Sequence, residues 1–137
     1  MPLKYPNLFK PIVLANNVFR NRIFASPQGY YNVGGDNLPG ADMVAFFERK
    51  ALGGAASVCV GDCIVDVDTG RHYPFLLDMK DENSLPGLSA LASAISRHGA
   101  VASAELSHAG MYATESASRS GKFYGPVAME GKYGLVE

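Results

Sequence analysis

The hydrophobic and polar positions of the chain follow two periods in alternation, one typical of strands and one typical of helices. Short apolar runs over 22–26, 56–65 and 100–108 predict buried strands, whereas 41–54 and 85–99 carry apolar residues at helical spacing. Strands that alternate with helices predict a parallel sheet with right-handed crossovers. The expected fold class is therefore α/β, with about three βα units.

The first expected helix has an apolar side, a polar side and a glycine stop. Gly53 suits the C′ position that ends a helix. The apolar residues that can share one side are Met43, Phe46, Phe47 and Leu52. The polar residues expected to face water are Glu48, Arg49 and Lys50.

The second expected helix has recognisable start and stop signals. Ser84 is a plausible N-cap residue, Pro86 suits the first turn, and Gly99 is expected to end the helix. Four residues form its apolar side, namely Leu88, Leu91, Ala92 and Ile95.

A small β-hairpin is expected ahead of the first buried strand. Apolar residues at Ile12–Leu14 and Val18–Phe19 flank Asn16–Asn17, and asparagine tolerates the left-handed backbone angles of tight turns. After the first strand comes a loop over 27–40, rich in glycine and asparagine, and loops of that length usually serve a function. The residues after His108 have no firm period, so we expect a loop there.

Composition and charge narrow the classes of partner. The chain has 137 residues, 47% of them hydrophobic and 18% charged, and a net charge of -1, so it should bury a core. No basic patch occurs, which disfavours nucleic acid and anionic membranes as partners. The start lacks the apolar core of a signal peptide, and no stretch approaches the roughly 18 apolar residues of a membrane span. We expect a cytoplasmic protein with small-molecule partners.

Two cysteines, Cys59 and Cys63, lie four residues apart in the second expected strand. At about 3.3 Å per residue they would lie on the order of 13 Å apart, which is too far for a disulfide. No further Cys or His cluster completes a metal site. We expect two reduced thiols that serve as small packing residues, and no metal.

Polar or small residues follow each expected strand where a core strand would stay aliphatic. These ends are Ser26–Gln28, Gly61–Cys63 and Glu105–His108. Ligands of parallel α/β folds bind at the carboxyl ends of the strands. The three ends are therefore the candidate site, although Ser26–Gln28 alone is also compatible with an ordinary strand end.

The third expected strand alternates between two faces. One set, expected toward the helices, comprises Ala102, Ala104, Leu106 and His108. The other set, turned away from them, comprises Ser103, Glu105 and Ser107. A buried carboxylate needs a partner, so Glu105 should meet either a ligand N–H or an arginine or lysine of a neighbouring strand. The spacing favours neither alternative.

Phosphate-binding and nucleophile motifs are absent from the sequence. Neither G-x-G-x-x-G nor G-x-x-x-x-G-K-[ST] occurs, so a dinucleotide-binding Rossmann site or a nucleoside triphosphate site is not indicated. No serine or cysteine lies in a G-x-S-x-G elbow either.

Several segments in order resemble the old yellow enzyme family of flavin-dependent oxidoreductases. They are "YPNLFKPIVLANNVFRNRIFASP", "FFERKALGGAASVCVGDCIVD" followed by "GR", "AELSHAGMYA", and "GPVA" at 125–128. Each motif is weak by itself, but their order and spacing together are specific, and the resemblance covers almost the whole chain. It implies the N-terminal part of a (β/α)8 TIM barrel with FMN as the prosthetic group.

The resemblance also implies roles for individual positions. Main chain around Ala25, Ser26, Pro27 and Gln28 would meet the isoalloxazine ring, and Gly61 and Asp62 would border it. Glu105 stands where many members have a glutamine that binds the pyrimidine edge. Tyr31 lies near a position that lines the substrate pocket, and it is the candidate catalytic residue. Gly29 falls where some members have a redox-tuning cysteine.

Two departures from the family pattern change the expected chemistry. Glu105 in place of glutamine would bring negative charge, if ionised, near the ring and so disfavour reduction of the flavin. Met111 replaces the arginine that commonly follows "HAG", which removes any contact from that arginine. The segments "VGDCIVD" and "ELSHAGMYA" resemble those of the anaerobic branch of the family, which includes dienoyl-CoA reductases. The iron–sulfur cluster and FAD or second dinucleotide domain of that branch would lie downstream of these residues.

The resemblance implies an ene-reductase type of reaction. Hydride would pass from NAD(P)H through the flavin to an activated alkene such as an enone or enoate. Because such a barrel needs about 250 residues, residues 1–137 are expected to form one partial domain that is inactive by itself. The alternative is a non-catalytic module that binds flavin or self-associates through open sheet edges.

Overall fold

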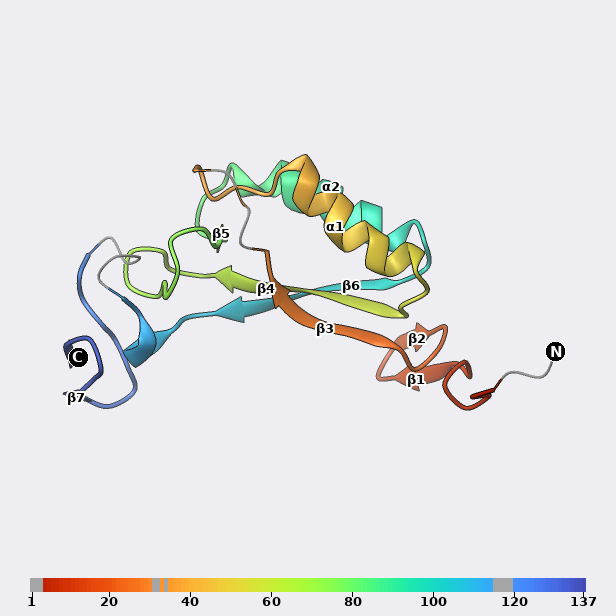
Figure 1. Cartoon of the computed structure of the whole chain (residues 1–137), viewed down its shortest axis with the longest axis horizontal. Helices are drawn as coiled ribbons and strands as arrows, with labels where there is room; N and C mark the ends of the chain where they lie inside the picture. Colours follow the sequence, from red (N-terminus) through yellow and green to blue (C-terminus); the bar gives the residue numbers. More distant parts are fainter. Residues whose placement is uncertain (1–3, 31–32, 34, 115–119) are drawn as a thin grey trace.

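A computed structural model describes residues 4–30, 33, 35–114 and 120–137 of the chain (Figure 1). Its main body is a sheet with two helices lying along one face. The N-terminal hairpin lies at one end of this layered body and the C-terminal segment lies at the other.

The central strand of the sheet is β4 (Ser57–Ile64), which pairs in parallel with every other strand of the sheet. Its partners are β3 (Phe24–Gly29), β5 (Leu77–Asp78) and β6 (Val101–Ser107). Most residues of β4 are buried, as expected for a central strand, although both helices lie on one face of the sheet. The alternation β3, helix, β4, helix, β6 confirms the α/β class with parallel βαβ units.

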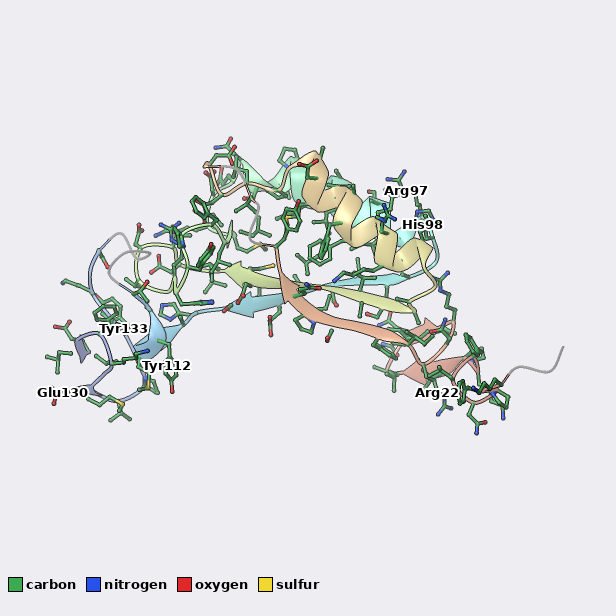
Figure 2. The ribbon with its side chains drawn as sticks, in the orientation of Figure 1. Arg22, Arg97, His98, Tyr112, Glu130 and Tyr133 are labelled. Carbon is green, nitrogen blue, oxygen red and sulfur yellow. The ribbon has the colours of Figure 1, made fainter. Side chains whose placement is uncertain are left out.

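The two helices, α1 (Ala41–Leu52) and α2 (Ser84–Ser96), pack against the sheet and against each other. Their buried side chains join those of β4 in one core that includes Met43, Phe47, Ala51, Val58, Val60, Leu91 and Ile95. The helices are also joined on their outer side, where Glu48 Oε1 lies 2.9 Å from His98 Nε2 and 3.3 Å from Arg97 Nε. Figure 2 shows His98 and Arg97 beyond the end of α2.

In each helix, one of the residues expected on the buried side is replaced there by another residue. In α1 the buried residue of the last turn is Ala51, and Leu52 is 67% exposed, because Met43, Phe47 and Ala51 recur every four residues. The left-handed residue after α1 is Gly54, with φ 105°, whereas Gly53 keeps helical angles. In α2 the buried alanine is Ala94.

The start of α2 also differs from the expectation. Asn83 is the N-cap, while Ser84 lies inside the first turn and donates its hydroxyl hydrogen to the carbonyl oxygen of Asp78. Ser84 therefore fastens the helix to the end of β5, which sequence reasoning did not predict. A two-residue strand such as β5 carries too few positions to show a period.

The first strand of the sheet begins and ends later than predicted. The expectation was a strand over 22–26, but β3 runs from Phe24 to Gly29 and contains Pro27. Proline has no N–H to donate, so it is tolerated only at edges and bulges. Here the register shifts between Ala25 and Gln28, and β3 has β4 as its only strand partner among the described residues.

The predicted N-terminal hairpin is present, with its turn one residue earlier than expected. β1 (Ile12–Leu14) pairs in antiparallel fashion with β2 (Asn17–Phe19), and Leu14 lies opposite Asn17. The two-residue turn is therefore Ala15–Asn16, and Ala15 takes the positive φ of 48°. Positive φ at the first central position matches the mirror-image turns that suit hairpins.

The residues after β6 are more ordered than the expected loop. A 3-10 turn, η1 (Gly110–Tyr112), is followed by a small antiparallel pair, β7 (Met129–Glu130) and β8 (Leu135–Val136). Three buried side chains form a separate core there, namely Ala113, Phe123 and Val136.

Arg20 and Asn21 fasten the hairpin to the loop that follows α1. Arg20 Nη2 donates to the carbonyl oxygens of Ala51 at 2.7 Å and Ala55 at 2.8 Å. Asn21 Nδ2 donates to the carbonyl oxygen of Gly54 at 2.8 Å. Ala51 lies in the last turn of α1, and Gly54 and Ala55 follow the helix, so these side chains hold the hairpin against this segment. In the described part of the chain, neither helix is long and apolar enough to cross a membrane.

Candidate functional site

The polar ends of three neighbouring strands meet at one end of the sheet. In the pairing register, Gly29 of β3 lies opposite Gly61 of β4, and Cys63 lies opposite Leu106 of β6. The main-chain N–H of Asp62 points to the side chain of Glu105, with 3.4 Å between N and Oε2. The strand ends that the sequence singled out therefore lie next to one another at one end of the sheet.

Part of the β3 main chain at this surface lies outside the ladder. Ala25 pairs with Val58 and Gln28 pairs with Val60, but the two residues between them have no Cα partner in β4. An irregularity of this kind leaves main-chain groups unpaired with the neighbouring strand and re-aims them. Ser26 and Pro27 thus present main-chain groups for another use.

Gly61 allows an unusually close approach of β3 to β4. A Cβ at Gly61 would lie 2.4 Å from the nitrogen and 2.7 Å from the carbonyl carbon of Gln28, and 2.9 Å from the carbonyl carbon of Pro27. All three atoms belong to the main chain, which cannot swing aside as a side chain can. Only glycine fits here, since even alanine would push the two strands apart.

Asp62 lies at a second irregularity, where the register of β4 with β6 shifts between Val60 and Cys63. Its φ is 51°, a left-handed conformation that aspartate tolerates better than most residues. Its Oδ2 lies 4.0 Å from His72 Nε2, in the loop that follows β4. His72, which follows the "GR" of the second motif, was not predicted as a neighbour of Asp62.

The sequence suggested that Glu105 is buried and therefore needs a partner, but the structure leaves this residue exposed. No salt bridge joins Glu105 to an arginine or lysine within the described part of the chain. The carboxylate is solvent-exposed and has the Asp62 N–H as a neighbour. It is therefore accessible to a ligand at the strand ends.

The side chain of Gln28 points away from this surface, toward α1. Lys50 Nζ donates to Gln28 Oε1 at 2.5 Å. Lys50 was expected in water, but its ammonium lies 4.4 Å from the centre of the Phe46 ring, and partial burial lowers its pKa. Tyr30 contacts the same ring, with 5.2 Å between centroids. Tyr31, the predicted catalytic residue, lies outside the described residues.

A polar network holds the loop after β4 against the end of β6. His108 Nε2 lies 3.0 Å from Thr69 Oγ1, and Thr69 donates to Asp66 at 2.6 Å. The hydrogen bond from Thr69, with help from Lys80 at 3.2 Å, lowers the pKa of Asp66. The His108 ring also packs on Gly70, where a Cβ would lie 2.5 Å from its Cδ2 atom. This network fixes where β6 ends, and sequence reasoning missed it.

The two cysteines are free thiols, as predicted. Cys63 is fully buried in the main core, and burial raises its pKa to about 12, with the neighbouring Cys59 adding to the effect. A buried thiol of this kind is a packing residue and not a nucleophile.

A family comparison identifies the chain. The model of the NADH:flavin oxidoreductase / NADH oxidase family matches residues 7–133. The chain belongs to this family. Its members are oxidoreductases that bind FMN and use NADH or NADPH.

Two curated members of the NADH:flavin oxidoreductase family are identical to the chain at about a third of the aligned positions. The 4,4'-dithiodibutanoate disulfide reductase of Rhodococcus erythropolis is 34% identical over 108 residues, which is 79% of this chain and 26% of that protein. The NADPH dehydrogenase of Listeria welshimeri is 31% identical over 104 residues, which is 75% of this chain and 30% of that protein. The chain thus spans less than a third of the length of these two relatives.

Solved structures of the family confirm the fold. The old yellow enzyme homologue from Zymomonas mobilis superimposes with a TM-score of 0.84 at 18% identity, over 96% of this chain and 39% of that chain. A 2-naphthoyl-CoA reductase superimposes with a TM-score of 0.86 at 23% identity, over 97% of this chain and 22% of that chain. The fold matches the N-terminal part of the old yellow enzyme barrels, as the motifs predicted.

Proposed function

We propose that the protein is an FMN-dependent oxidoreductase of the ene-reductase type. It would transfer hydride from NAD(P)H through FMN to an activated alkene, such as an enone or an enoate. The observation that carries the proposal is the meeting of three polar strand ends around main chain that the β3–β4 ladder leaves free. Membership of the flavin oxidoreductase family supports the cofactor.

The residues at the strand ends fit a flat ring with polar edges. Such a ring needs main-chain donors and acceptors in a fixed position and no side chain in its way. Gly61 supplies the close approach, and the register shift supplies the free main chain. The residues that would hold or border the ring are Ala25, Ser26, Pro27, Gln28, Gly61, Asp62 and Glu105.

FMN, when bound, supplies the hydride acceptor and donor of the reaction. The main chain of Ser26–Gln28 orients the ring against the sheet. The carboxylate of Glu105, beside the Asp62 N–H, sets the charge at the ring's edge. Tyr31 is proposed on the substrate side of the site. Glu105 opposes the build-up of negative charge during reduction, because like charges repel.

Because residues 1–137 are expected to be inactive by themselves, the function is tested with a complete barrel that contains them, together with FMN, NADPH or NADH, and 2-cyclohexen-1-one. We expect a yellow protein that oxidises the nicotinamide only when the enone is present, with the saturated ketone as product. A protein that does not bind FMN, or that binds it and leaves the enone unchanged, would overturn the proposal.

A substitution at Glu105 tests its place at the ring. Glu105→Gln should raise the midpoint potential of bound FMN by on the order of tens of millivolts, because removal of one negative charge favours the reduced flavin. Glu82→Gln removes an exposed carboxylate before α2 and serves as the matched control. Equal potentials in the two variants would place Glu105 away from the ring.

A second candidate function is a non-catalytic module that binds flavin or self-associates. Two features of β6 favour it: Leu106 is 65% exposed, and Ala102 and Ala104 line an apolar groove of about 280 Å³ between β6 and α2. Apolar surface along a strand edge promotes association. A colourless, oligomeric protein in sedimentation velocity would support this candidate, whereas a yellow and enone-reducing protein would exclude it.

A further inference from the structure

The side chain of one lysine of α1 reaches from the helix to the exposed residue Gln28 near the end of β3. Arg49, its neighbour, is exposed to solvent, whereas Lys50 is only partly exposed. The Lys50 ammonium donates to Gln28 Oε1 across the helix–sheet interface, 22 residues away in sequence. A charged donor on a neutral acceptor is stronger than a neutral pair.

Aromatic rings hold this ammonium in place. The Lys50 Nζ lies 4.4 Å from the centre of the Phe46 ring and 5.2 Å from that of Phe47. Phe46 in turn contacts Tyr30, which follows directly after β3. A cation over aromatic faces is attracted to them, so the long side chain is fixed by more than one contact.

Gln28 is therefore held on two sides. Its main chain lies against Gly61, closer than any side chain would allow. Its side chain is bound from the opposite side by Lys50. The preceding residues, Ser26 and Pro27, have no Cα partner in β4, so their position depends on the anchors that flank them. Those anchors are the pairing of Ala25 with Val58 and the fixed Gln28.

We propose that Lys50 is a positioning residue, which binds the Gln28 side chain from the helix layer and so sets the place of the Ser26–Gln28 main chain. Lys50 does not reach the strand-end surface itself and acts through Gln28. The inference rests on the proposed function, because that main chain is the part of β3 assigned to FMN. Lys50 would thus be a residue of the helix layer, and not of the strand ends, that affects FMN binding.

The experiment compares FMN dissociation constants in the purified protein. Lys50→Met keeps an unbranched side chain that is one atom shorter and removes the donor, and we expect about tenfold weaker binding and a shifted absorbance spectrum of bound FMN. Lys50→Arg keeps a charged donor and should restore binding to within about threefold of wild type. Arg49→Met is the matched control, since it removes a charge from the same turn and should change neither.

A double variant tests whether Lys50 acts through Gln28. Gln28→Leu alone should weaken FMN binding about as much as Lys50→Met, and the double variant should be no worse than either single one. Additive losses would overturn the proposed route. So would a Lys50→Met protein whose affinity and spectrum equal those of wild type.

Hydrogen exchange separates this inference from the proposed function. If wild type does not bind FMN, the proposed function fails, but the positioning role is still measurable in the ligand-free protein. The Gln28 and Gly29 amides should then exchange about tenfold faster in Lys50→Met and at the wild-type rate in Arg49→Met. Equal rates in all three proteins would overturn the role of Lys50. If Lys50→Met does not fold, Gln28→Leu poses the same question.

Discussion

Gly61→Ala is the sharpest single test of the site's geometry. The added methyl group would meet three main-chain atoms of β3, the closest of them 2.4 Å away, where ordinary contacts begin at 3.4 Å. Both strands are paired, so neither yields without breaking ladder hydrogen bonds. β3 would have to move away from β4 by about 1 Å, and with it the main chain of Ser26–Gln28.

The expected loss of stability follows from this clash. Overpacking in a close-packed interior typically costs about 1–3 kcal/mol, and a clash with main chain on both sides belongs at the upper end. A loss of about 3 kcal/mol lowers the melting temperature of a domain of this size by about 10 °C. FMN affinity should fall as well, because the displaced strand carries the proposed ring contacts.

The assay is thermal unfolding followed by circular dichroism, with FMN binding measured in parallel below the transition. Gly35→Ala is the matched control, since a Cβ there would have nothing within 4 Å. Its melting temperature should stay within a few degrees of wild type. A Gly61→Ala protein that melts with the control and binds FMN normally would refute the close approach of the two strands.

Three other predictions concern the layers around the site. Arg20→Met should lower the free energy of unfolding by about 2 kcal/mol, because it strips hydrogen bonds from carbonyls at the end of α1; an unchanged urea midpoint would contradict this. Cys63 should resist thiol reagents at pH 8 until the protein unfolds, since burial raises its pKa to about 12, while half-buried Cys59 reacts first; mass spectrometry of the labelled protein decides. The His98 hydrogen bond lowers the pKa of Glu48. The ionised Glu48 therefore stabilises the fold above its ordinary pKa of 4.5, and this stability is lost as pH falls through the lowered pKa. Glu48→Gln should reduce this loss of unfolding free energy at acid pH, as measured by urea unfolding at several pH values. An unchanged pH dependence would count against the Glu48–His98 pair.

The long elements were predictable because their pattern repeats over several turns or pleats. α1 was predicted from Met43, Phe46 and Phe47, and two of these are fully buried. The strand predicted over 56–65 differs from β4 by one residue at each end. In such segments one misplaced residue does not hide the period, and burial on one or both faces reinforces it.

The short elements were not predictable because long-range pairing creates them. β5, β7 and β8 have two residues each, and a period cannot be read from two positions. The persistence of β3 through Pro27 depends on a register shift against β4, which no local propensity encodes. The burial of Ala51, where Leu52 was expected, has the same origin, because packing against the sheet determines which residue of the last turn is buried.

The candidate site was predicted as a set of strand ends but not as a set of contacts. Topology alone brings the ends of parallel strands to one edge, so the polar residues there could be grouped from the sequence. The residues that contact them were not predicted. The sequence pattern indicated that Lys50 faces water, and it gave no reason to distinguish His72 from other loop residues. Charges at helical spacing indicate a solvated face unless the fold places an acceptor beside them.

The site presents mostly main-chain groups, which explains why a motif that is weak in sequence can mark a specific site. Main-chain groups are nearly the same in every residue, so the strand ends can present the same donors and acceptors in relatives that are identical at only about a third of the aligned positions. The constraint then falls on the residues that permit or fix that main chain, which here are Gly61, with no room for a Cβ, and the Lys50–Gln28 pair. Glu105 is the exception, because its side chain itself faces the surface. Differences in reactivity within the family should therefore arise at such side-chain positions, while the scaffold of the ring site stays constant.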